Sequence, residues 1–304
     1  MICSLFAVVA AAEEPVRLGG LTGPTAMGMV KVLSDGEYSH TIVGAADELT
    51  PLVLQGQLDI VSVPANLAAT LYNKTEGGVR VLAVNVLGVL YIGEFNTQEL
   101  NSVSDLKGKT IYATGKGSTP EYFLRYVLTQ NGIDPDKDVD IQWKSEPSEV
   151  VALLNAEGKG IAMLPQPYVT AAGTQLGEGF RVAISLSDEW AALDNGTLCT
   201  TAVVMARSAF VDENPEAVEA FLEDFAASAQ WVNENVADAA ALCEEYGIIK
   251  APVAKKAIPN CNIVCITGNE MKDALSGCLQ VIFDQNPKAV GGKLPLDDFY
   301  YGAE

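Results

Sequence analysis

Residues 110–120 read Thr-Ile-Tyr-Ala-Thr-Gly-Lys-Gly-Ser-Thr-Pro, and this stretch decides the fold that we predict. Its first five residues predict a strand, and the next six form a glycine-rich loop. Residues 121–131 follow with apolar side chains at helical spacing, so the order is strand, loop, helix. The loop is not a P-loop, in which a lysine directly precedes Ser or Thr at a fixed distance from an earlier glycine. The sequence therefore argues against ATP binding.

Similar loops recur along the chain. Residues 21–26, 64–66 and 165–168 each follow a predicted strand, and the first two lead into a predicted helix. Strands that alternate with helices favour a parallel or mixed α/β sheet. In such sheets, ligands bind outside the carboxyl ends of the strands, where helix N-termini offer unpaired N–H groups. The four loops therefore predict where a ligand binds, although the loop at 115–120 is also compatible with an ordinary helix cap and no ligand.

Length and charge restrict the possible partners. The chain has 304 residues, of which 49% are hydrophobic, and a single core seldom grows to this size, so we expect two domains. A polar turn at residues 104–109 suggests that a second lobe begins near residue 100. The formal net charge is −20, from 19 basic and 39 acidic residues. Such a surface repels phosphate groups, so we expect neither nucleic acid nor an anionic membrane surface as a partner.

The amino end has the pattern of a secretory signal. Residues 1–12 carry no charged side chain and end in small residues, but the usual basic beginning is missing. We therefore expect a truncated signal segment, and a first buried strand or helix is the alternative. Residues 79–92 are also apolar, but they are too few to span a bilayer and include Asn85.

The cysteines do not suggest a complete disulfide framework. Five of them follow the signal segment, and an odd number leaves at least one unpaired. We expect them to act mainly as small buried residues, and one bridge with unpaired cysteines is the alternative.

Few residues suggest catalysis. His40 is the only histidine and lies in a predicted strand, so we expect a structural role. Cys261 and Cys265 lack zinc-knuckle spacing and a histidine partner. The sequence has no Gly-x-Ser-x-Gly motif, and no pair of carboxylates stands out as acid and base. We therefore predict no catalytic residue, no metal and no cofactor. Trp190 is compatible with two roles, stacking on an aromatic ligand or packing at a domain edge.

Several segments together resemble one family. Two segments carry most of the resemblance: residues 105–111, Asp-Leu-Lys-Gly-Lys-Thr-Ile, and residues 115–122, Gly-Lys-Gly-Ser-Thr-Pro-Glu-Tyr. They are similar to the opening of the second lobe in type II periplasmic binding proteins of the sulfonate-, nitrate- and thiamine-precursor-binding kind. Residues 55–66, 165–168 and 217–232 resemble further segments of that family, in the same order. The resemblance covers most of the chain after residue 15 and is more specific for the fold than for the ligand.

The resemblance implies an α/β fold of two lobes, with mixed sheets flanked by helices and a ligand cleft between the lobes. The first lobe would hold residues 13–95 and 200–304, and the second residues 96–199. Gln166 stands where the family often has an acidic residue, which disfavours a cationic ligand. Family position implies the ligand-binding residues of the four loops, to which we add Asn85 and Trp190. The full predicted set is Thr22, Gly23, Thr25, Asn66, Asn85, Gly117, Ser118, Thr119, Gln166, Tyr168 and Trp190.

The function implied is that of a secreted solute-binding component of an ABC importer, a monomer that delivers a small molecule to a membrane permease. The ligand would be a small anionic or heteroaromatic nutrient, such as a thiamine-precursor pyrimidine, a riboflavin-like ring or an alkyl sulfonate. Backbone N–H groups near Ser118 and Thr119 would bind the anion, and Tyr168 or Trp190 would flank a ring. The alternative is an enzyme on the same fold, of the futalosine pathway or of thiamine-pyrimidine biosynthesis. The chain lacks the cysteine-rich iron motif of the latter. A sensory ligand-binding module is a third reading, disfavoured because no signalling domain is attached.

Overall fold

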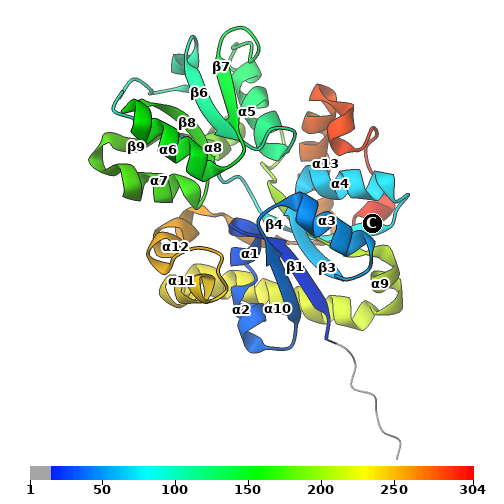
Figure 1. The fold of residues 1–304 in the computed structure, drawn as a ribbon. Helices are drawn as coiled ribbons and strands as arrows, with labels where there is room; N and C mark the ends of the chain where they lie inside the picture. Colours follow the sequence, from blue (N-terminus) through cyan, green and yellow to red (C-terminus); the bar gives the residue numbers. More distant parts are fainter. Residues whose placement is uncertain (1–14) are drawn as a thin grey trace, which may run out of the picture.

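The computed structural model describes residues 15–304 and contains two lobes, each built on one β-sheet (Figure 1). The predicted signal segment, residues 1–12, lies outside the described residues. Both sheets are mixed and flanked by helices, so the predicted fold class is confirmed.

The first lobe contains a six-stranded sheet with the strand order β11-β4-β10-β3-β1-β2. Strand β1 is parallel to β2 and β3, whereas β10 is antiparallel to β3 and β4. The carboxyl ends of β1 and β3 therefore meet at one edge of the sheet. The strands are β1 Arg17–Leu21, β2 Ser39–Val43, β3 Ile60–Pro64, β4 Val79–Val86, β10 Ala202–Arg207 and β11 Ile263–Ile266.

The second lobe contains a five-stranded sheet with the order β7-β6-β8-β5-β9. Strand β6 is parallel to β7 and β8, so the carboxyl ends of these three strands share one edge. Strand β5 runs antiparallel to β8 and β9. The strands are β5 Leu90–Phe95, β6 Thr110–Thr114, β7 Asp140–Lys144, β8 Gly160–Pro165 and β9 Phe180–Ser185.

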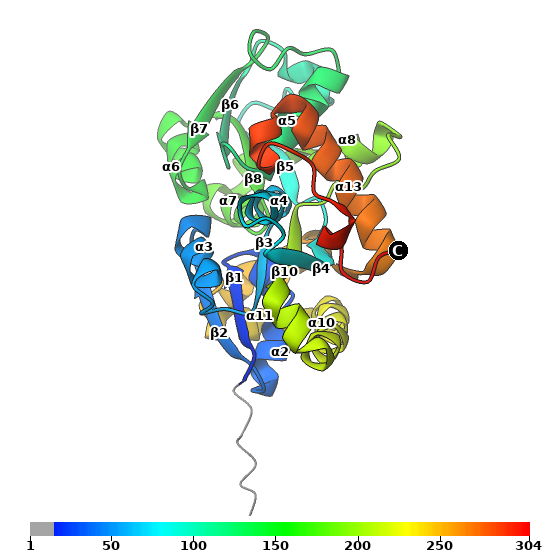
Figure 2. The ribbon, with the colours of Figure 1, turned by 90° about the vertical axis from the view of Figure 1, so that its right-hand side faces the viewer.

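Helices cover both sheets (Figures 1 and 2). Helix α10 begins with Pro215 after Asn214, a position that suits proline, and its apolar stripe of Val218, Phe221 and Phe225 is buried. The helices are α1 Pro24–Met27, α2 Val30–Asp35, α3 Ala46–Leu54, α4 Ala65–Lys74, α5 Thr119–Gln130, α6 Pro147–Glu157, α7 Tyr168–Leu176, α8 Leu186–Ala192, α9 Ser208–Glu213, α10 Pro215–Glu234, α11 Val236–Glu245, α12 Ala251–Ala257 and α13 Gly268–Gln285.

The chain crosses between the lobes within the apolar run of residues 79–92. Residues 79–92 form parts of two strands in different sheets, β4 and β5, joined by residues 87–89. A Cβ on Gly88 would lie 2.0 Å from Oγ of Ser187, so only glycine fits this passage. Because β5 belongs to the second sheet, the lobe boundary predicted at residue 95 was wrong for residues 90–95. The remaining division between the lobes stays a prediction. We call residues 87–89 and 199–201 the crossover segments.

Helix α13 packs against both lobes (Figure 2). It contacts α4 and β4 of the first lobe and α5 of the second. Near its middle, the thiol of Cys278 donates a hydrogen bond to the carbonyl oxygen of Thr200, in a crossover segment, at 3.3 Å. At its end, Nε2 of Gln285 donates to the carbonyl oxygen of Tyr122 in α5 at 3.1 Å. The largest apolar core is therefore continuous between the two sheets through α13 and α5.

The five cysteines of the described residues are free thiols, and four of them are buried. Burial raises the pKa of Cys243 and Cys278 to about 12 and that of half-buried Cys265 to about 11. Because the thiolate is the nucleophile, we expect the folded protein to react slowly with Ellman's reagent at pH 8, with Cys265 reacting first among these five. Guanidinium should expose all of them. Rapid labelling of two or more of these thiols in the folded protein would contradict this expectation.

Candidate functional site

Two of the predicted residues meet across the lobes. Thr119, the first residue of α5, donates a hydrogen bond from Oγ1 to Oδ1 of Asn66 in the first turn of α4, at 3.0 Å. Nδ2 of Asn66 donates to the carbonyl oxygen of Ala289 at 3.2 Å, which holds the amide in place. Thr119 is fully buried, and Asn66 is 6% exposed. The N-termini of α4 and α5 therefore face each other.

The other two loops also meet. A Cβ on Gly23, which precedes α1, would lie 4.0 Å from Cδ of Pro167, which precedes α7. The backbone N–H of Gln166 donates to the carbonyl oxygen of Val89 in a crossover segment at 2.9 Å. Loops that follow β1, β3, β6 and β8 thus come together between the lobes, as expected for strands whose carboxyl ends converge. We call residues 22–25, 64–66, 118–119 and 166–168 the inter-lobe loops.

The inter-lobe loops present neutral polar groups and helix N-termini. Helices α4, α5 and α7 have no hydrogen bond from a capping side chain, although the N–H of Ala65 at the start of α4 donates to the carbonyl oxygen of Thr201 at 3.1 Å. Each N-terminus also carries a partial positive charge. No side chain of the inter-lobe loops is ionisable except the phenol of half-buried Tyr168. This arrangement is chemically suited to a small anion, which helix dipoles and neutral donors stabilise together.

Three residues of the loops have internal roles. Oγ1 of Thr25 donates to the carbonyl oxygen of Leu21 at 2.5 Å, which closes the first loop. The N–H of Thr22 donates to the carbonyl oxygen of Val43 at 2.9 Å. Oε1 of Gln166 accepts a hydrogen bond from Oγ1 of Thr170 at 2.8 Å, which leaves the amide nitrogen of Gln166 as the donor for other groups.

The glycine-rich loop uses its own donors more than predicted. Gly117 is exposed, and its N–H donates to Oε2 of Glu121 at 2.6 Å. Oγ of Ser118 donates to the carbonyl oxygen of Gly115 at 2.8 Å. The carboxylate of Glu121, in the first turn of α5, thus takes the place at the loop that we expected a ligand anion to take. The N–H of Gly117 is therefore engaged within the loop, its place among the ligand-binding residues stays a prediction, and Thr119 is the residue of this loop that bonds to the first lobe.

Trp190 is a core residue. It is 1% exposed, and its ring lies 4.8 Å from the ring of Phe123 and 4.8 Å from that of Tyr126, between centroids. Its Nε1 lies 3.2 Å from both the carbonyl oxygen and the hydroxyl of Thr197. Because two aromatic neighbours and the hydrogen bonds already occupy the ring, the predicted stacking of Trp190 on a ligand was wrong, and its packing role is the correct one.

Asn85 lies near the end of β4, at an irregularity in the pairing with β10 between Ala202 and Val203. Such bulges re-aim a side chain. Nδ2 of Asn85 donates to Oγ of Ser62 in β3 at 2.7 Å, whereas Oδ1 is buried without a partner. The residue is 1% exposed, so its polar oxygen lies inside the protein and close to a crossover segment.

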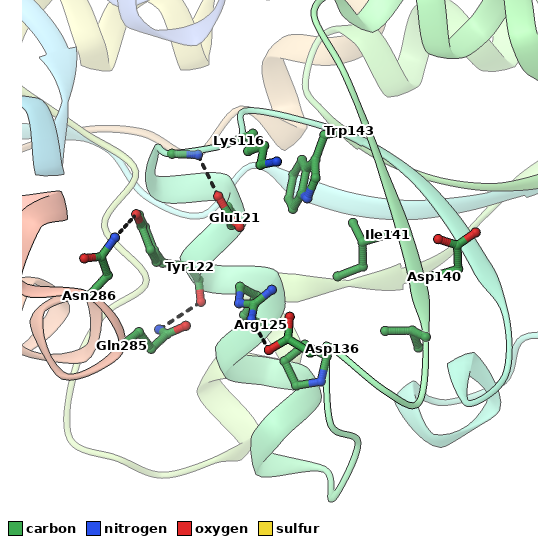
Figure 3. Close-up of a pocket in the computed structure, with 13 residues that line it drawn as sticks. Lys116, Glu121, Tyr122, Arg125, Asp136, Asp140, Ile141, Trp143, Gln285 and Asn286 are labelled. Atoms are coloured by element: carbon green, nitrogen blue, oxygen red, sulfur yellow. Dashed lines mark hydrogen bonds and ion pairs between the residues drawn. The ribbon is translucent and has the colours of Figure 1, made fainter.

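A hollow of about 840 Å³ adjoins the glycine-rich loop, and no motif in the sequence predicted it (Figure 3). Two of the charged side chains that line it, Arg125 and Asp136, form an ion pair at 2.6 Å. Because it shares only Gly117 with the predicted set, we place the candidate site at the inter-lobe loops. We call it the lateral hollow, and the side chains drawn in Figure 3 line it: Lys116, Gly117, Glu121, Tyr122, Arg125, Pro135, Asp136, Val139, Asp140, Ile141, Trp143, Gln285 and Asn286.

A comparison with known protein families identifies the family of this chain. The sequence model of the NMT1-like family matches residues 43–245, which is more than half of the chain. The chain belongs to the NMT1-like family. The match includes residues from each inter-lobe loop except the first, which precedes residue 43.

Solved structures confirm the type II periplasmic-binding-protein fold of this NMT1-like protein. An ABC transporter from Parabacteroides distasonis has a TM-score of 0.80 at 25% identity, and the match covers 94% of this chain and 98% of that one. The periplasmic aliphatic sulphonate binding protein SsuA from Escherichia coli has a TM-score of 0.76 at 18% identity, covering 95% and 92%. The alkanesulfonate-binding protein SsuA from Xanthomonas axonopodis, bound to MOPS, has a TM-score of 0.65 at 15% identity, covering 94% and 96%.

None of the curated proteins matches this NMT1-like chain. Within residues 15–304, no helix combines the length and the apolar composition that crossing a membrane requires.

Proposed function

We propose that this NMT1-like protein is the extracytoplasmic solute-binding component of an ABC importer, which binds one small molecule between its lobes and delivers it to a membrane permease. The observation that carries the proposal is the meeting of α4 and α5 through Asn66 and Thr119. A ligand held by groups from both lobes favours the form in which they are close, and that form is what a transporter can recognise. The kinship with ABC-transporter binding proteins supports the same role.

We propose a small anionic or heteroaromatic ligand. The N-termini of α4, α5 and α7 would hold an anionic group, and Tyr168, half-buried at the start of α7, would flank a ring. Two of the similar structures are named for binding sulfonates. The inter-lobe loops contain no carboxylate, histidine or cysteine, so their side chains supply binding groups rather than an acid and base pair.

Thermal unfolding in the presence of candidate ligands tests the proposal. The panel contains nitrate, ethanesulfonate, MOPS, aminopyrimidines and flavins. A ligand at about 100 times its Kd adds roughly 2.7 kcal/mol to the free energy of unfolding, which corresponds to several degrees for a protein of this size. One chemical class should raise the midpoint without being converted, as mass spectrometry of the recovered ligand would verify. Chemical conversion of a bound compound would instead favour an enzyme.

Thr119→Val should weaken binding of the panel ligand about tenfold. The change keeps the shape of the side chain but removes its hydroxyl, which leaves Oδ1 of buried Asn66 without its partner from the second lobe. Calorimetric titration measures the loss. Thr174→Val is a matched control, because Thr174 is an exposed threonine of α7 whose hydroxyl bonds only within the helix. Equal affinities for the two variants would contradict a role for Thr119 in the site.

A further inference from the structure

Buried oxygen atoms without hydrogen-bond partners gather at the crossover segments. Within residues 15–304, such atoms include Oγ1 of Thr200 and Thr201, Oδ1 of Asn85 and Oγ of Ser187. Thr200 and Thr201 lie in one crossover segment. Asn85 lies two residues before the other segment, and Ser187 packs against Gly88 within it. Buried polar groups are nearly always paired in folded proteins, so a cluster of unpaired ones at one place calls for a reason.

This cluster adjoins the inter-lobe loops. The carbonyl oxygen of Thr201 accepts the N–H of Ala65, the first residue of α4, at 3.1 Å. The N–H of Thr201 donates at 2.9 Å to the carbonyl oxygen of Val86, the residue after Asn85. The unpaired oxygens therefore lie near the N-terminus of α4. The second residue of that helix, Asn66, accepts the hydrogen bond from Thr119 of the second lobe.

Asn85 has a defined chemical preference. Its Nδ2 is committed to Ser62, so the free end of the amide is Oδ1, which only accepts hydrogen bonds. An anion such as nitrate or a simple sulfonate carries acceptors alone and leaves Oδ1 unpaired. A ligand with a hydroxyl or amino group can donate to it. A site built around a buried acceptor rejects analogues without the donor more strongly than an apolar pocket rejects a missing methylene.

We infer that the ligand carries a hydroxyl or amino donor in addition to its anionic or ring part, and that Asn85 selects for this donor at the crossover segments. The inference rests on the proposed function and makes it more specific. The anionic part binds at the helix N-termini, and the donor points away from them toward β4. Thr200 and Thr201 offer hydroxyls that can bond to the same group or to a water beside it.

Two matched ligand series test the inference by calorimetric titration. The first is ethanesulfonate, 2-hydroxyethanesulfonate and 2-aminoethanesulfonate, and the second is nicotinate and 6-aminonicotinate. Within the series that binds, a donor-bearing member should bind roughly 10- to 100-fold more tightly than the member without a donor. In Asn85→Leu, which keeps the branched shape and the number of side-chain heavy atoms but has no hydrogen-bonding group, this ratio should fall to near one. An equal affinity of both members for the unchanged protein would overturn the inference, as would a ratio that survives in Asn85→Leu.

The stability of the unliganded protein gives a second, independent readout. A double variant, Asn85→Leu with Ser62→Ala, removes the unpaired oxygen together with its one partner, so the midpoint of thermal unfolding should stay the same or rise. A fall of several degrees would show that the amide is satisfied and structural, and would overturn the inference. If a member without a donor binds as tightly as its donor-bearing partner, the inference fails and the proposed function stands, whereas if no member of either series or of the earlier panel binds, both fail.

Discussion

Trp190→Ala is expected to lower the free energy of unfolding by about 3–5 kcal/mol, the largest effect that we predict for a single substitution. The indole is 1% exposed and packs against Phe123 and Tyr126, and its Nε1 lies within hydrogen-bonding distance of Thr197. Alanine would leave a large cavity inside the second lobe and an unpaired acceptor on Thr197. Urea unfolding followed by circular dichroism measures the change.

Trp143→Ala is the matched control for this prediction. Trp143 lies half-buried in the edge strand β7 and faces the lateral hollow, so its removal should cost much less stability. Ligand affinity provides the second comparison. If Trp190→Ala unfolded at the same urea concentration as Trp143→Ala but lost ligand binding, the ring would act on the ligand, and the packing role described above would be wrong.

Asp59→Asn is expected to destabilise the protein by about 2–3 kcal/mol. The carboxylate is 5% exposed and joins three strands of the first sheet. It accepts hydrogen bonds from Nη2 of Arg17 at 2.6 Å and from Nη2 of Arg207 at 2.7 Å, as well as from the backbone N–H of Arg17 at 3.0 Å. Loss of one partner from a buried ion pair usually costs about 3–5 kcal/mol, and the partial exposure of both arginines reduces this.

The pH dependence of this effect has a definite sign. Burial alone would raise the pKa of Asp59, but hydrogen bonds from Arg17 and Arg207 outweigh it and lower the pKa below its usual 3.8. A carboxyl group with a lowered pKa stabilises the folded state when the pH is above the pKa of the unfolded state. This stabilisation is lost as the pH falls through the pKa of the folded state. The difference between the unchanged protein and Asp59→Asn should therefore be full at pH 6 and shrink below pH 3.8. A difference that grows toward low pH would contradict this assignment.

An exposed ion pair supplies the control for Asp59. Arg80 and Asp212 lie 2.7 Å apart, and the side chain of Asp212 is 60% exposed. Asp212→Asn should change the free energy of unfolding by less than about 1 kcal/mol, because water and salt screen such a pair. A loss as large as that of Asp59→Asn would mean that burial does not set the difference.

The strand, loop and helix pattern located the candidate site because its spacing is local. Thr119 and Asn66 were predicted from separate loops, and parallel strands bring their carboxyl ends to one edge without any further information. Packing between segments that are distant in the sequence could not be predicted in this way. The partners of Trp190 lie more than 60 residues away in the chain, in α5, so its two possible roles could not be separated by its neighbours in sequence.

Two other features escaped prediction for physical reasons of the same kind. Strands β4 and β5 are both buried, so the apolar run through residues 79–92 shows no break where the chain leaves one sheet for the other. The glycine-rich loop looked open to an anion because its sequence does not reveal that Glu121 turns back to accept the N–H of Gly117. The lateral hollow combines three distant segments, none of which has a motif of its own.

The position of α13 determines how far each part of the molecule can travel. Displacement in a rigid rotation grows with distance from the axis, and α13 is attached to both lobes and to Thr200 between them. Any axis that preserves these attachments lies beside α13. The widest separation then occurs on the opposite flank, where α12 lies against α7 and the phenol of Tyr91 donates to the carbonyl oxygen of Asn260 at 3.1 Å (Figure 1). Under the proposed function, we expect a solute to reach Asn66 and Thr119 through that flank.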